Sequence, residues 1–378
     1  MEGNETIREL AKKGIPPEKI LEYLKRDGIS TDIEEIKFEI LRMRALKKHP
    51  DALKMFFTDE TLRFATPKEV GEYRAKRISG SGAKIIADLC SGIGLQAIEF
   101  ARYFEKVYAV EVDQKKIEIA KRNASALGIS NIEFLQADIF QDQTIEKIKD
   151  AEAIFCDPSR SPSEEERRLE QIPEIRKIIS DYSGITDNIC IEAPPQIPPE
   201  RINLDCEAEY LSLYWKLNRL NLYFGALKRC DRSAILLPGE DYLQSRNIEL
   251  KLKRIENGRF IYEVNPAVRK AGLIAEAIPP EFDAGIFYED KKDIMLASDE
   301  PFESPYLRRY KIMERCSRNP SDINRRLIAL GAGRALIRGR IAQDEYWNFR
   351  NALERGLSGS ATFHIFLTGD SAVICREF

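Results

Sequence analysis

Short apolar runs alternate with helical patterns in the first half of the chain. The run 85–94, IIADLCSGIG, predicts a buried strand that ends in an acid and two spaced glycines. Further strands are predicted at 107–111, 131–136 and 153–156, with helical patterns between the first three strands. This alternation predicts an α/β fold with an open parallel sheet.

The turn after the first strand leaves two cofactors open. Gly92 allows the chain to turn sharply and Gly94 allows a ligand to approach the backbone, because neither residue has a Cβ atom. Gly92, Gly94 and Ala97 also match the spacing of nicotinamide-binding turns, so a dehydrogenase is the first alternative. The acids near the strand ends distinguish the two cofactors.

An acidic residue lies at or just after the end of each of the four predicted strands. These residues are Asp88, Glu111, Asp138 and Asp157. Because the carboxyl ends of parallel strands share one crevice, we expect the four carboxylates to face one ligand. They would repel a pyrophosphate and attract S-adenosylmethionine, which carries a sulfonium and an α-ammonium group and has no phosphate. The arrangement therefore favours a methyl donor over a nicotinamide.

The same segments resemble a known family. IADLCSGIG, YAVEVD, LQAD and FCDPSR are similar to the successive cofactor and catalytic motifs of class I S-adenosylmethionine-dependent methyltransferases. The resemblance implies a Rossmann-like fold with a seven-stranded sheet. It also implies a set of cofactor-binding residues, namely Thr66, Arg74, Asp88, Cys90, Gly92, Gly94, Glu111, Val112, Asp138 and Ile139. Within this set, Asp88 and the glycines would hold the methionine part, Glu111 the ribose, and Asp138 with Ile139 the adenine.

The segment 64–78, FATPKEVGEYRAKRI, resembles the start of the methyltransferase domain in trimethylguanosine synthases. The resemblance implies that this segment folds over the methionine end of the donor, with Thr66 and Arg74 as candidate contacts for the donor carboxylate. A connector whose aromatic side chains fill the core is the alternative for each residue.

Later apolar runs at 188–191, 207–213, 220–225 and 233–237 predict further strands. The last three fit the antiparallel hairpin that methyltransferases add to their parallel sheet and that a nicotinamide fold usually lacks. This feature distinguishes the two cofactor classes independently of the acids.

Asp157, Pro158 and Arg160 are the predicted catalytic residues. Methyl transfer depends more on an in-line approach of the nucleophile than on acid or base catalysis. Asp157 would accept a hydrogen bond from an acceptor amine or ring nitrogen, or take its proton, and Pro158 would fix the carbonyl beside it. Arg160 either clamps a phosphate or stacks on a base, or it forms a salt bridge with Glu164 or Glu165.

This catalytic motif departs from the pattern of exocyclic-amine methyltransferases. That pattern places two prolines and an aromatic ring after the acid or amide, whereas here Ser159 and Arg160 follow Pro158. Cys156, beside Phe155 in a predicted strand, is expected to be a small core residue. A buried thiol of this kind disfavours covalent methylation of a pyrimidine carbon.

Three helices are predicted before these motifs, at 6–13, 17–27 and 30–48. We expect them to form a small N-terminal helical cap. The third helix carries four basic residues, Arg42, Arg44, Lys47 and Lys48. They form either a solvated helix face or a contact with nucleic acid.

A small C-terminal α/β module is predicted from residue 306 onward, and its first part is strongly basic. The basic residues are Arg308, Arg309, Lys311, Arg315, Arg318, Arg325, Arg326, Arg334, Arg338 and Arg340, opposed there by only Glu314 and Asp322. Because the arginine fork suits paired phosphate oxygens, the module predicts RNA binding. The alternative is that several of these cations pair with acids elsewhere, including Glu345 and Glu354.

The C-terminal half carries a second resemblance. GRFIYEVNPAVRKAGL, SDEPFESPYLRRYKIMERC and SATFHIFLTG are similar to segments of methyltransferases that end in a THUMP-like domain. The likeness covers about residue 55 to the end. THUMP domains in the strict sense accompany RNA-modifying enzymes, so the resemblance suggests RNA as the partner.

Composition and charge limit the ligands, metal sites and cellular location that we expect for the protein. The 378 residues carry a formal net charge of −3, so no global attraction to nucleic acid is expected. The seven cysteines include no CxxC pair and only two histidines are present, which predicts reduced thiols and no metal centre. Since no apolar stretch is long enough to span a bilayer and the first residues are too charged for a secretory signal, we expect a cytoplasmic protein without membrane contacts.

Together these observations predict four parts, a helical region at 1–54, a class I methyltransferase domain at 55–245, a connecting segment at 246–305 and a THUMP-like module at 306–378. The predicted function is S-adenosylmethionine-dependent methylation of structured RNA, tRNA or rRNA, at a base nitrogen. The alternatives are a methyltransferase for a small molecule or a protein, and an RNA-binding protein with a vestigial donor pocket.

Overall fold

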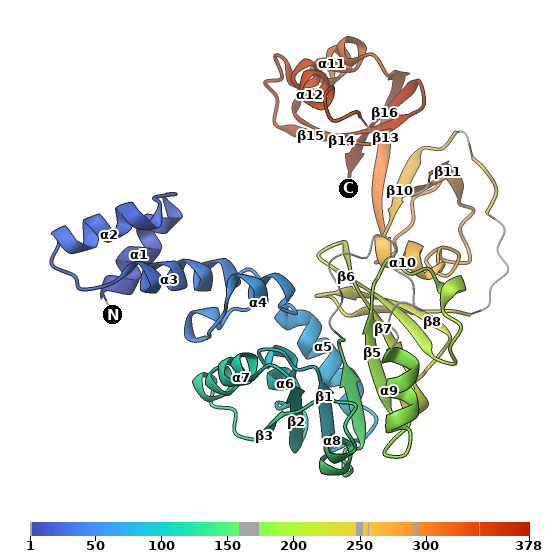
Figure 1. The fold of residues 1–378 in the computed structure, drawn as a ribbon. Helices are drawn as coiled ribbons and strands as arrows, with labels where there is room; N and C mark the ends of the chain where they lie inside the picture. Colours follow the sequence, from blue (N-terminus) through green and yellow to red (C-terminus); the bar gives the residue numbers. More distant parts are fainter. Residues whose placement is uncertain (1, 159–173, 247–251, 256, 291–292, 340) are drawn as a thin grey trace. The chain divides into compact units, whose positions relative to one another are not determined.

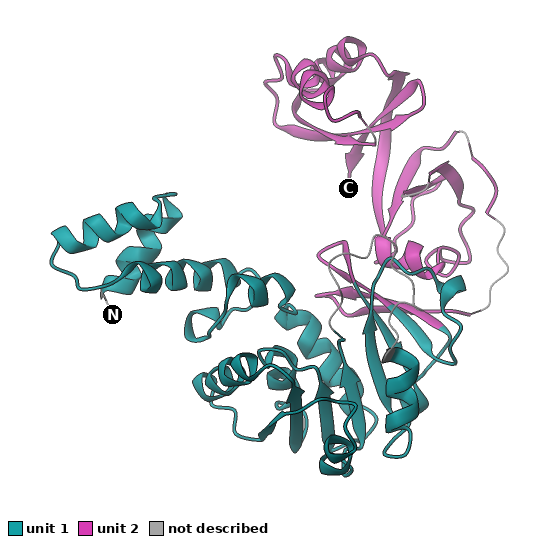
Figure 2. Cartoon of the chain, viewed as in Figure 1, with its two compact units in different colours: residues 1–209, 219–231 teal, residues 210–218, 232–378 magenta. Residues whose placement is uncertain are grey.

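The computed structural model describes the chain outside residues 1, 159–173, 247–251, 256, 291–292 and 340 (Figure 1). Two compact units are present, unit 1 with residues 1–209 and 219–231, and unit 2 with residues 210–218 and 232–378 (Figure 2). Each unit has apolar clusters of its own. None of the helices in the described ranges combines the length and the apolar character that crossing a membrane requires.

Unit 1 begins with three helices, α1 (Glu2–Lys12), α2 (Pro17–Arg26) and α3 (Ile33–Ala45). Their apolar faces meet in a small core built around the fully buried side chains of Ile7, Ile20, Leu24 and Ile36. Helix α3 begins after Asp32, whose carboxylate accepts the backbone N–H of Glu35 at 2.8 Å. Such a cap satisfies an N–H group that has no partner within the helix.

The chain then forms η1 (Ala52–Lys54), α4 (Asp59–Phe64) and α5 (Lys68–Ser79). The Lys48 ammonium group donates to the carbonyls of Leu62 and Ala65, both at 2.9 Å, and thereby satisfies the C-terminal end of α4. Arg42 donates to the Met55 carbonyl at 2.8 Å. The basic residues of α3 and its C-terminus therefore include at least two that hold unit 1 together.

The first sheet has nine strands, whereas the family resemblance implies seven. Their order is β3-β2-β1-β4-β5-β7-β6-β8-β9. Strands β1 to β5 are parallel, and β7 pairs antiparallel with β5. The apolar run at 233–237 predicts β8, whereas β9 was not predicted, and the two strands form an antiparallel pair. The strand bounds are β1 Ile85–Leu89, β2 Lys106–Glu111, β3 Ile132–Gln136, β4 Ala153–Cys156, β5 Ile189–Ala193, β6 Glu207–Leu213, β7 Lys216–Tyr223, β8 Arg232–Leu237 and β9 Asp241–Gln244.

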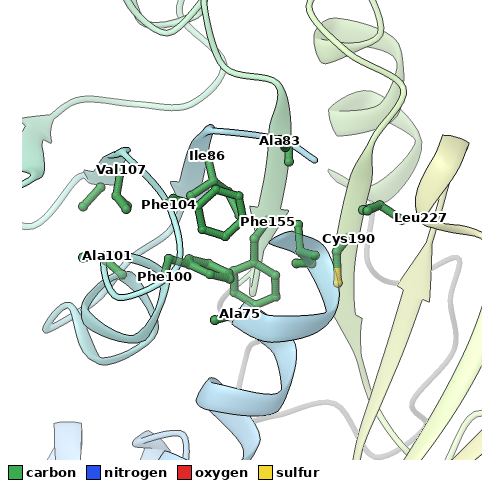
Figure 3. Close-up of a cluster of buried hydrophobic side chains, with 14 of the residues drawn as sticks. Ala75, Ala83, Ile86, Phe100, Ala101, Phe104, Val107, Phe155, Cys190 and Leu227 are labelled. Atoms are coloured by element: carbon green, nitrogen blue, oxygen red, sulfur yellow. The ribbon is translucent and has the colours of Figure 1, made fainter. Parts of the chain in front are cut away.

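Helices cover the parallel strands of unit 1. Figure 3 shows Phe100 of α6 beside Phe155 of β4, with ring centroids 5.5 Å apart, and Ala75 of α5 and Ile86 of β1 in the same buried cluster. Burying each such aromatic side chain contributes about 1.5–3 kcal/mol. This cluster packs α5 and α6 against β1 and β4. The remaining helices of the first half are α6 Leu95–Phe100, α7 Gln114–Ala126, α8 Asp142–Lys147, α9 Glu174–Tyr182, η3 Pro199–Arg201 and η4 Gly225–Leu227.

The second sheet lies in unit 2 and has seven strands in the order β11-β12-β10-β13-β16-β15-β14. Strand β10, from the predicted connecting segment, pairs with β13 of the predicted C-terminal module. The bounds are β10 Phe260–Val264, β11 Gly285–Glu289, β12 Ile294–Ser298, β13 Leu307–Ser317, β14 Ala332–Arg338, β15 Ala361–Thr368 and β16 Ser371–Glu377, with helices α10 Pro266–Ala271, α11 Pro320–Ala329 and α12 Tyr346–Glu354.

Candidate functional site

The turn between β1 and α6 has an unusual backbone. Gly92 and Gly94 have φ values of 57° and 79°, and Cys90 has a φ of 80° although it carries a side chain. A Cβ atom on Gly94 would lie 3.0 Å from the Cβ of Ala120, so close packing on α7 requires glycine there. The backbone N–H groups of Cys90 and Ser91 both donate to the Val110 carbonyl, which anchors the turn on β2.

Asp88, on β1, is the most deeply buried acid of the site, with 1% of its surface exposed. Its Oδ2 atom has no hydrogen-bond partner within the described residues. Burial raises the pKa of Asp88 to about 8, and the neighbouring charges of Asp157 and Glu111 act in the same direction. The structure therefore brings together three of the four acids that the strand pattern predicted.

Glu111, at the end of β2, is oriented by two backbone groups. One carboxylate oxygen accepts the N–H of Gly92 at 2.9 Å and the other accepts the N–H of Asp113 at 3.0 Å. A carboxylate oxygen can accept two hydrogen bonds, so each oxygen can accept one more. Glu111 can therefore bind two adjacent hydroxyl groups while it holds the glycine turn in place. Val112, the next residue, is largely exposed.

Asp138 and Ile139 follow β3. Asp138 is exposed, and its Oδ1 atom accepts the backbone N–H of Phe140 at 2.9 Å. Ile139 is buried, and its carbonyl accepts the hydroxyl of Tyr182 at 2.5 Å. Burial raises the pKa of Tyr182, with smaller contributions from Cys156 and other neighbours, so this tyrosine of α9 is a neutral donor. Tyr182 is not among the site residues predicted from the sequence.

Arg74 of α5 is completely buried and contacts several protein side chains. One terminal nitrogen donates to the Gln96 amide oxygen at 2.7 Å, and the other donates to Glu192 at 2.6 Å and to Asn221 at 2.9 Å. The guanidinium also lies over the Phe155 ring, 4.4 Å from its centroid. Both terminal nitrogens thus have protein partners, whereas the sequence analysis placed a donor carboxylate there.

Thr66 is buried at the start of the same segment, and its backbone carbonyl accepts a hydrogen bond from Nε2 of His49 at 2.7 Å. Burial lowers the pKa of His49, so the ring is neutral. This contact ties the segment before α5 to the residues that follow α3.

Asp157 and Pro158 follow β4 directly. Asp157 is half-buried and close enough to Asp88 to influence its charge, and Pro158 is buried. Arg160, the third predicted catalytic residue, lies outside the described residues. The Cys156 and Cys90 sulfurs are 3.9 Å apart. The hydrogen bond between these thiols, together with burial, raises the pKa of Cys156 well above its usual value.

Asn123 is a buried residue that the sequence analysis missed. Its side chain accepts the N–H of Phe56 at 2.7 Å and donates to the carbonyls of Phe56 and Ile93, each at 3.2 Å. Asn123 therefore joins the segment after α3 to the glycine turn. An asparagine inside a helix gives no signal of such long-range contacts, because they depend on residues 30 and 67 positions away.

Within the described ranges, at least five of the ten predicted RNA-binding cations are paired with acids of unit 2. The pairs are Arg308–Glu263, Arg309–Glu303, Arg325–Asp322, Arg326–Glu314 and Arg338–Glu263, at 3.9, 2.8, 2.5, 2.6 and 3.7 Å. The sequence analysis expected Glu345 and Glu354 among the partners, but Glu354 pairs with Arg350. The missed acids, Glu263 and Glu303, precede the basic segment in the chain.

Three of the cations, Lys311, Arg315 and Arg334, form no ion pair within the described parts of the chain. Arg315 lies over the Phe287 ring, 5.3 Å from its centroid, and donates to the Gly258 carbonyl. Arg318 donates to the Gly369 carbonyl at 3.1 Å. Arg340 falls outside the residues that the structure describes. In the same described ranges, no cluster of three or more histidine, cysteine or acidic residues is arranged to hold a metal ion.

Comparisons with known proteins point to one class of enzyme. Residues 83–164 match the sequence profile of RNA cap guanine-N2 methyltransferases. Two uncharacterised S-adenosylmethionine-dependent methyltransferases from Mycobacterium tuberculosis strains are 23% identical over 293 residues, which is 75% of this chain and 77% of each relative. A tRNA/tmRNA (uracil-C(5))-methyltransferase from Nitratiruptor is 29% identical over 108 residues, 25% of this chain and 30% of that protein.

One solved structure matches the whole chain. It is a protein from Porphyromonas gingivalis W83 that is described only provisionally as a methyltransferase. The TM-score is 0.74 with 15% sequence identity, and the match covers 100% of this chain and 98% of that one. At this identity the likeness concerns the fold, and it includes the C-terminal sheet as well as the nine-stranded sheet.

Proposed function

The chain is an S-adenosylmethionine-dependent methyltransferase, and we propose that it methylates structured RNA, tRNA or rRNA, at a base nitrogen. The convergence of Asp88, Glu111 and Asp157 beside the glycine turn is the observation that carries the proposal. The profile match of residues 83–164 to RNA cap guanine-N2 methyltransferases supports RNA as the substrate class. The relative from Nitratiruptor, which acts on tRNA and tmRNA, supports the same class over a quarter of the chain.

The residues of the site fit the donor. Asp88 offers a buried carboxylate oxygen without a partner within the described residues, which suits a cationic group. Glu111 can accept hydrogen bonds from two ribose hydroxyls. Apart from the chain neighbours of Gly92, no described residue has an atom within 4 Å of the position that a Cβ on Gly92 would occupy, so the turn has space on that side. When bound, S-adenosylmethionine supplies a methyl group already activated by its sulfonium.

In the proposed mechanism, Asp157 positions the acceptor. Its carboxylate would accept a hydrogen bond from an acceptor N–H and take that proton once the nitrogen becomes cationic. Pro158 restricts the backbone beside it, so the carbonyl of Asp157 keeps a fixed direction. Arg74, through Glu192, Gln96 and Asn221, holds the surrounding strands and would act as a positioning residue. Methyl transfer depends strongly on such positioning, because the nucleophile must approach the methyl carbon in line.

Cys156 favours a nitrogen acceptor over a pyrimidine carbon. Methylation of a pyrimidine carbon by a covalent route needs a thiolate nucleophile, and the hydrogen bond with Cys90 and burial raise the pKa of the Cys156 thiol. A thiol that stays protonated is a poor nucleophile. We therefore propose a direct transfer without a covalent enzyme–base intermediate.

The C-terminal sheet is proposed to be the THUMP-like, RNA-binding part of the protein. Lys311 and Arg334 support this assignment because they form no ion pair within the described ranges and are exposed. A cation that is already paired gains less from a phosphate than an unpaired one does. A methyltransferase for a small molecule or a protein would not need these cations.

Transfer of labelled methyl groups to total RNA from cells that lack the protein tests the proposal, with the modified nucleoside identified by mass spectrometry. We expect label in tRNA or rRNA, at a base nitrogen. Asp157→Ala should lower kcat by about 100- to 10,000-fold, as loss of a proton acceptor does, and weaken donor binding by much less. The exposed Asp205→Ala is the matched control and should keep full activity. Label in proteins or small molecules, with none in RNA, would refute the RNA assignment.

A further inference from the structure

The turn between β6 and β7 carries two large aromatic residues in a costly backbone conformation. Tyr214 and Trp215 have φ values of 49° and 64°, so both lie in the left-handed region. Strands β6 and β7 are neighbours in the sheet, and a tight turn with two such residues normally contains Asn-Gly or Gly-Gly. A Cβ atom disfavours this conformation, and aromatic residues gain nothing from it locally. Backbone strain of this kind concentrates at functional sites.

The two aromatic residues of the turn differ in their exposure to solvent. The Tyr214 side chain is 59% exposed. Trp215 is half-buried, and its indole nitrogen is enclosed without a hydrogen-bond partner within the described residues. An enclosed N–H that lacks a partner opposes folding, as does the left-handed backbone. The turn therefore holds the Trp215 ring partly buried and leaves more than half of the Tyr214 surface exposed.

Arg308 supports the turn from β13, in the same unit. Its guanidinium lies over the Trp215 ring, 4.3 Å from the centroid, and 3.9 Å from the Glu263 carboxylate. Such a cation–π contact fixes the indole plane. Lys216, directly after the turn, is exposed and forms no ion pair within the described residues. The turn thus combines an exposed ring, a fixed second ring and nearby positive charge.

We propose that Tyr214 stacks on an unpaired nucleobase of the RNA, with Trp215 and Arg308 as positioning residues and Lys216 near a phosphate. This inference rests on the proposed RNA substrate. Every base has a π face, so stacking on an exposed aromatic ring suits single-stranded RNA of any sequence, and neighbouring cations bind the backbone. A paired base in a duplex has no exposed face, so the turn selects unpaired regions of a structured RNA.

The test compares Tyr214→Gly, Tyr214→Phe and the unmodified full chain by fluorescence anisotropy. The probes are a labelled single-stranded oligoadenylate and a labelled blunt RNA duplex. We expect Tyr214→Gly to bind the single strand about 5- to 100-fold more weakly, the loss that removal of one base–aromatic stack causes, and to bind the duplex unchanged. Tyr214→Phe keeps the ring and should bind both probes like the unmodified protein.

Thermal stability distinguishes a binding role from a structural one. Because glycine adopts the left-handed conformation without a Cβ clash, Tyr214→Gly should raise Tm by about 2–4 °C while it weakens binding. A structural tyrosine would lower Tm when removed. Equal affinity of Tyr214→Gly and the unmodified chain for oligoadenylate, or a lowered Tm with parallel losses on both probes, would overturn the proposal.

Trp347→Ala is the matched control. Trp347 is 62% exposed, and Arg350 lies over its ring at 5.6 Å, but it occupies an ordinary position in α12. Its removal should leave both affinities unchanged, and a loss equal to that of Tyr214→Gly would overturn the assignment to the turn.

Two further outcomes separate this inference from the proposed function. If the unmodified chain transfers labelled methyl groups to RNA but Tyr214→Gly keeps the oligoadenylate affinity of the unmodified chain, the stacking proposal alone fails. If the unmodified chain neither labels RNA nor binds oligoadenylate, the proposed function fails with it.

Discussion

Asp88 is a buried acid whose charge depends on what binds beside it. Burial and the nearby charges of Asp157 and Glu111 raise the pKa of Asp88 to about 8, and Arg74 only partly opposes them. Below this pH the carboxyl group is largely protonated in the donor-free protein. A cationic ligand stabilises the carboxylate, so donor binding below about pH 8 must release a proton from Asp88.

We therefore predict that donor affinity rises between about pH 6 and about pH 8, by up to about tenfold per pH unit, and levels off above that range. Calorimetric titrations in two buffers with different ionisation heats give the number of protons released. The donor has an ammonium group that also titrates, so Asp88→Asn serves as the reference. The unmodified protein should release up to about one proton more than this variant at pH 7, and equal proton counts would contradict the role of Asp88.

Glu111 gives a second prediction at the level of single residues. Glu111→Ala removes the acceptor for the Gly92 N–H as well as the proposed acceptor for the ribose hydroxyls. Loss of two hydrogen bonds to a charged group should weaken donor binding by about 100-fold or more, measured by calorimetry. Glu105→Ala, an exposed acid that pairs with Lys84, is the control and should not change donor affinity.

A donor analogue without the ribose hydroxyls separates the two roles of Glu111. If the carboxylate binds these hydroxyls, the analogue should bind the unmodified protein more weakly, and Glu111→Ala should not discriminate between donor and analogue. If Glu111→Ala still prefers the donor over the analogue as strongly as the unmodified protein does, the losses of affinity are additive. Glu111 would then only hold the glycine turn and would not bind the ribose hydroxyls.

At the scale of elements, the features that could be predicted are those that depend on residues close together in the sequence. Short apolar runs and the turn residues next to them, within about ten positions of one another, predict the parallel strands and their acids. The strands β1 to β4 could therefore be predicted. The surroundings of Arg74 could not, because Glu192 and Asn221 lie 118 and 147 positions further along the chain. Tertiary contacts at that distance leave no periodic signal.

Asn123 shows how one helix couples two other segments. It bonds to Phe56 in the segment after α3 and to Ile93 in the glycine turn. Asn123→Ala leaves three backbone groups without these partners, at a cost of about 1–3 kcal/mol for each group that stays buried. We predict a lower Tm together with weaker donor binding, because the turn loses its anchor.

Asn131→Ala is the control for Asn123→Ala. Asn131 also donates to backbone carbonyls, those of Ala101 and Phe104, both at 2.9 Å, but it does not contact the glycine turn. Its removal should lower Tm by a comparable amount and leave donor affinity unchanged. If both variants weaken donor binding in proportion to their loss of stability, the specific link through Asn123 is wrong.

At the scale of the whole molecule, the placement of charges would decide how the proposed RNA substrate is bound. A net charge of −3 gives no general attraction to a polyanion, so affinity must come from cations that are not already neutralised. Within unit 2, Arg326 pairs with Glu314 at 2.6 Å and Asp322 at 3.4 Å, whereas Arg334 forms no ion pair in the described ranges. Each phosphate contact releases a counterion, and the salt dependence of binding counts these contacts.

Arg334→Gln should therefore lower the slope of log affinity against log salt concentration by about 0.7–0.9, the contribution of one phosphate contact. Arg326→Gln removes the same charge from the same unit, so long-range electrostatics weaken affinity in both variants. Its slope should change by less than half as much, because its acids already hold that cation in the absence of RNA. Anisotropy titrations of unfractionated tRNA over a series of salt concentrations measure both slopes. Equal changes in slope would mean that pairing within unit 2 does not determine which cations reach the phosphates.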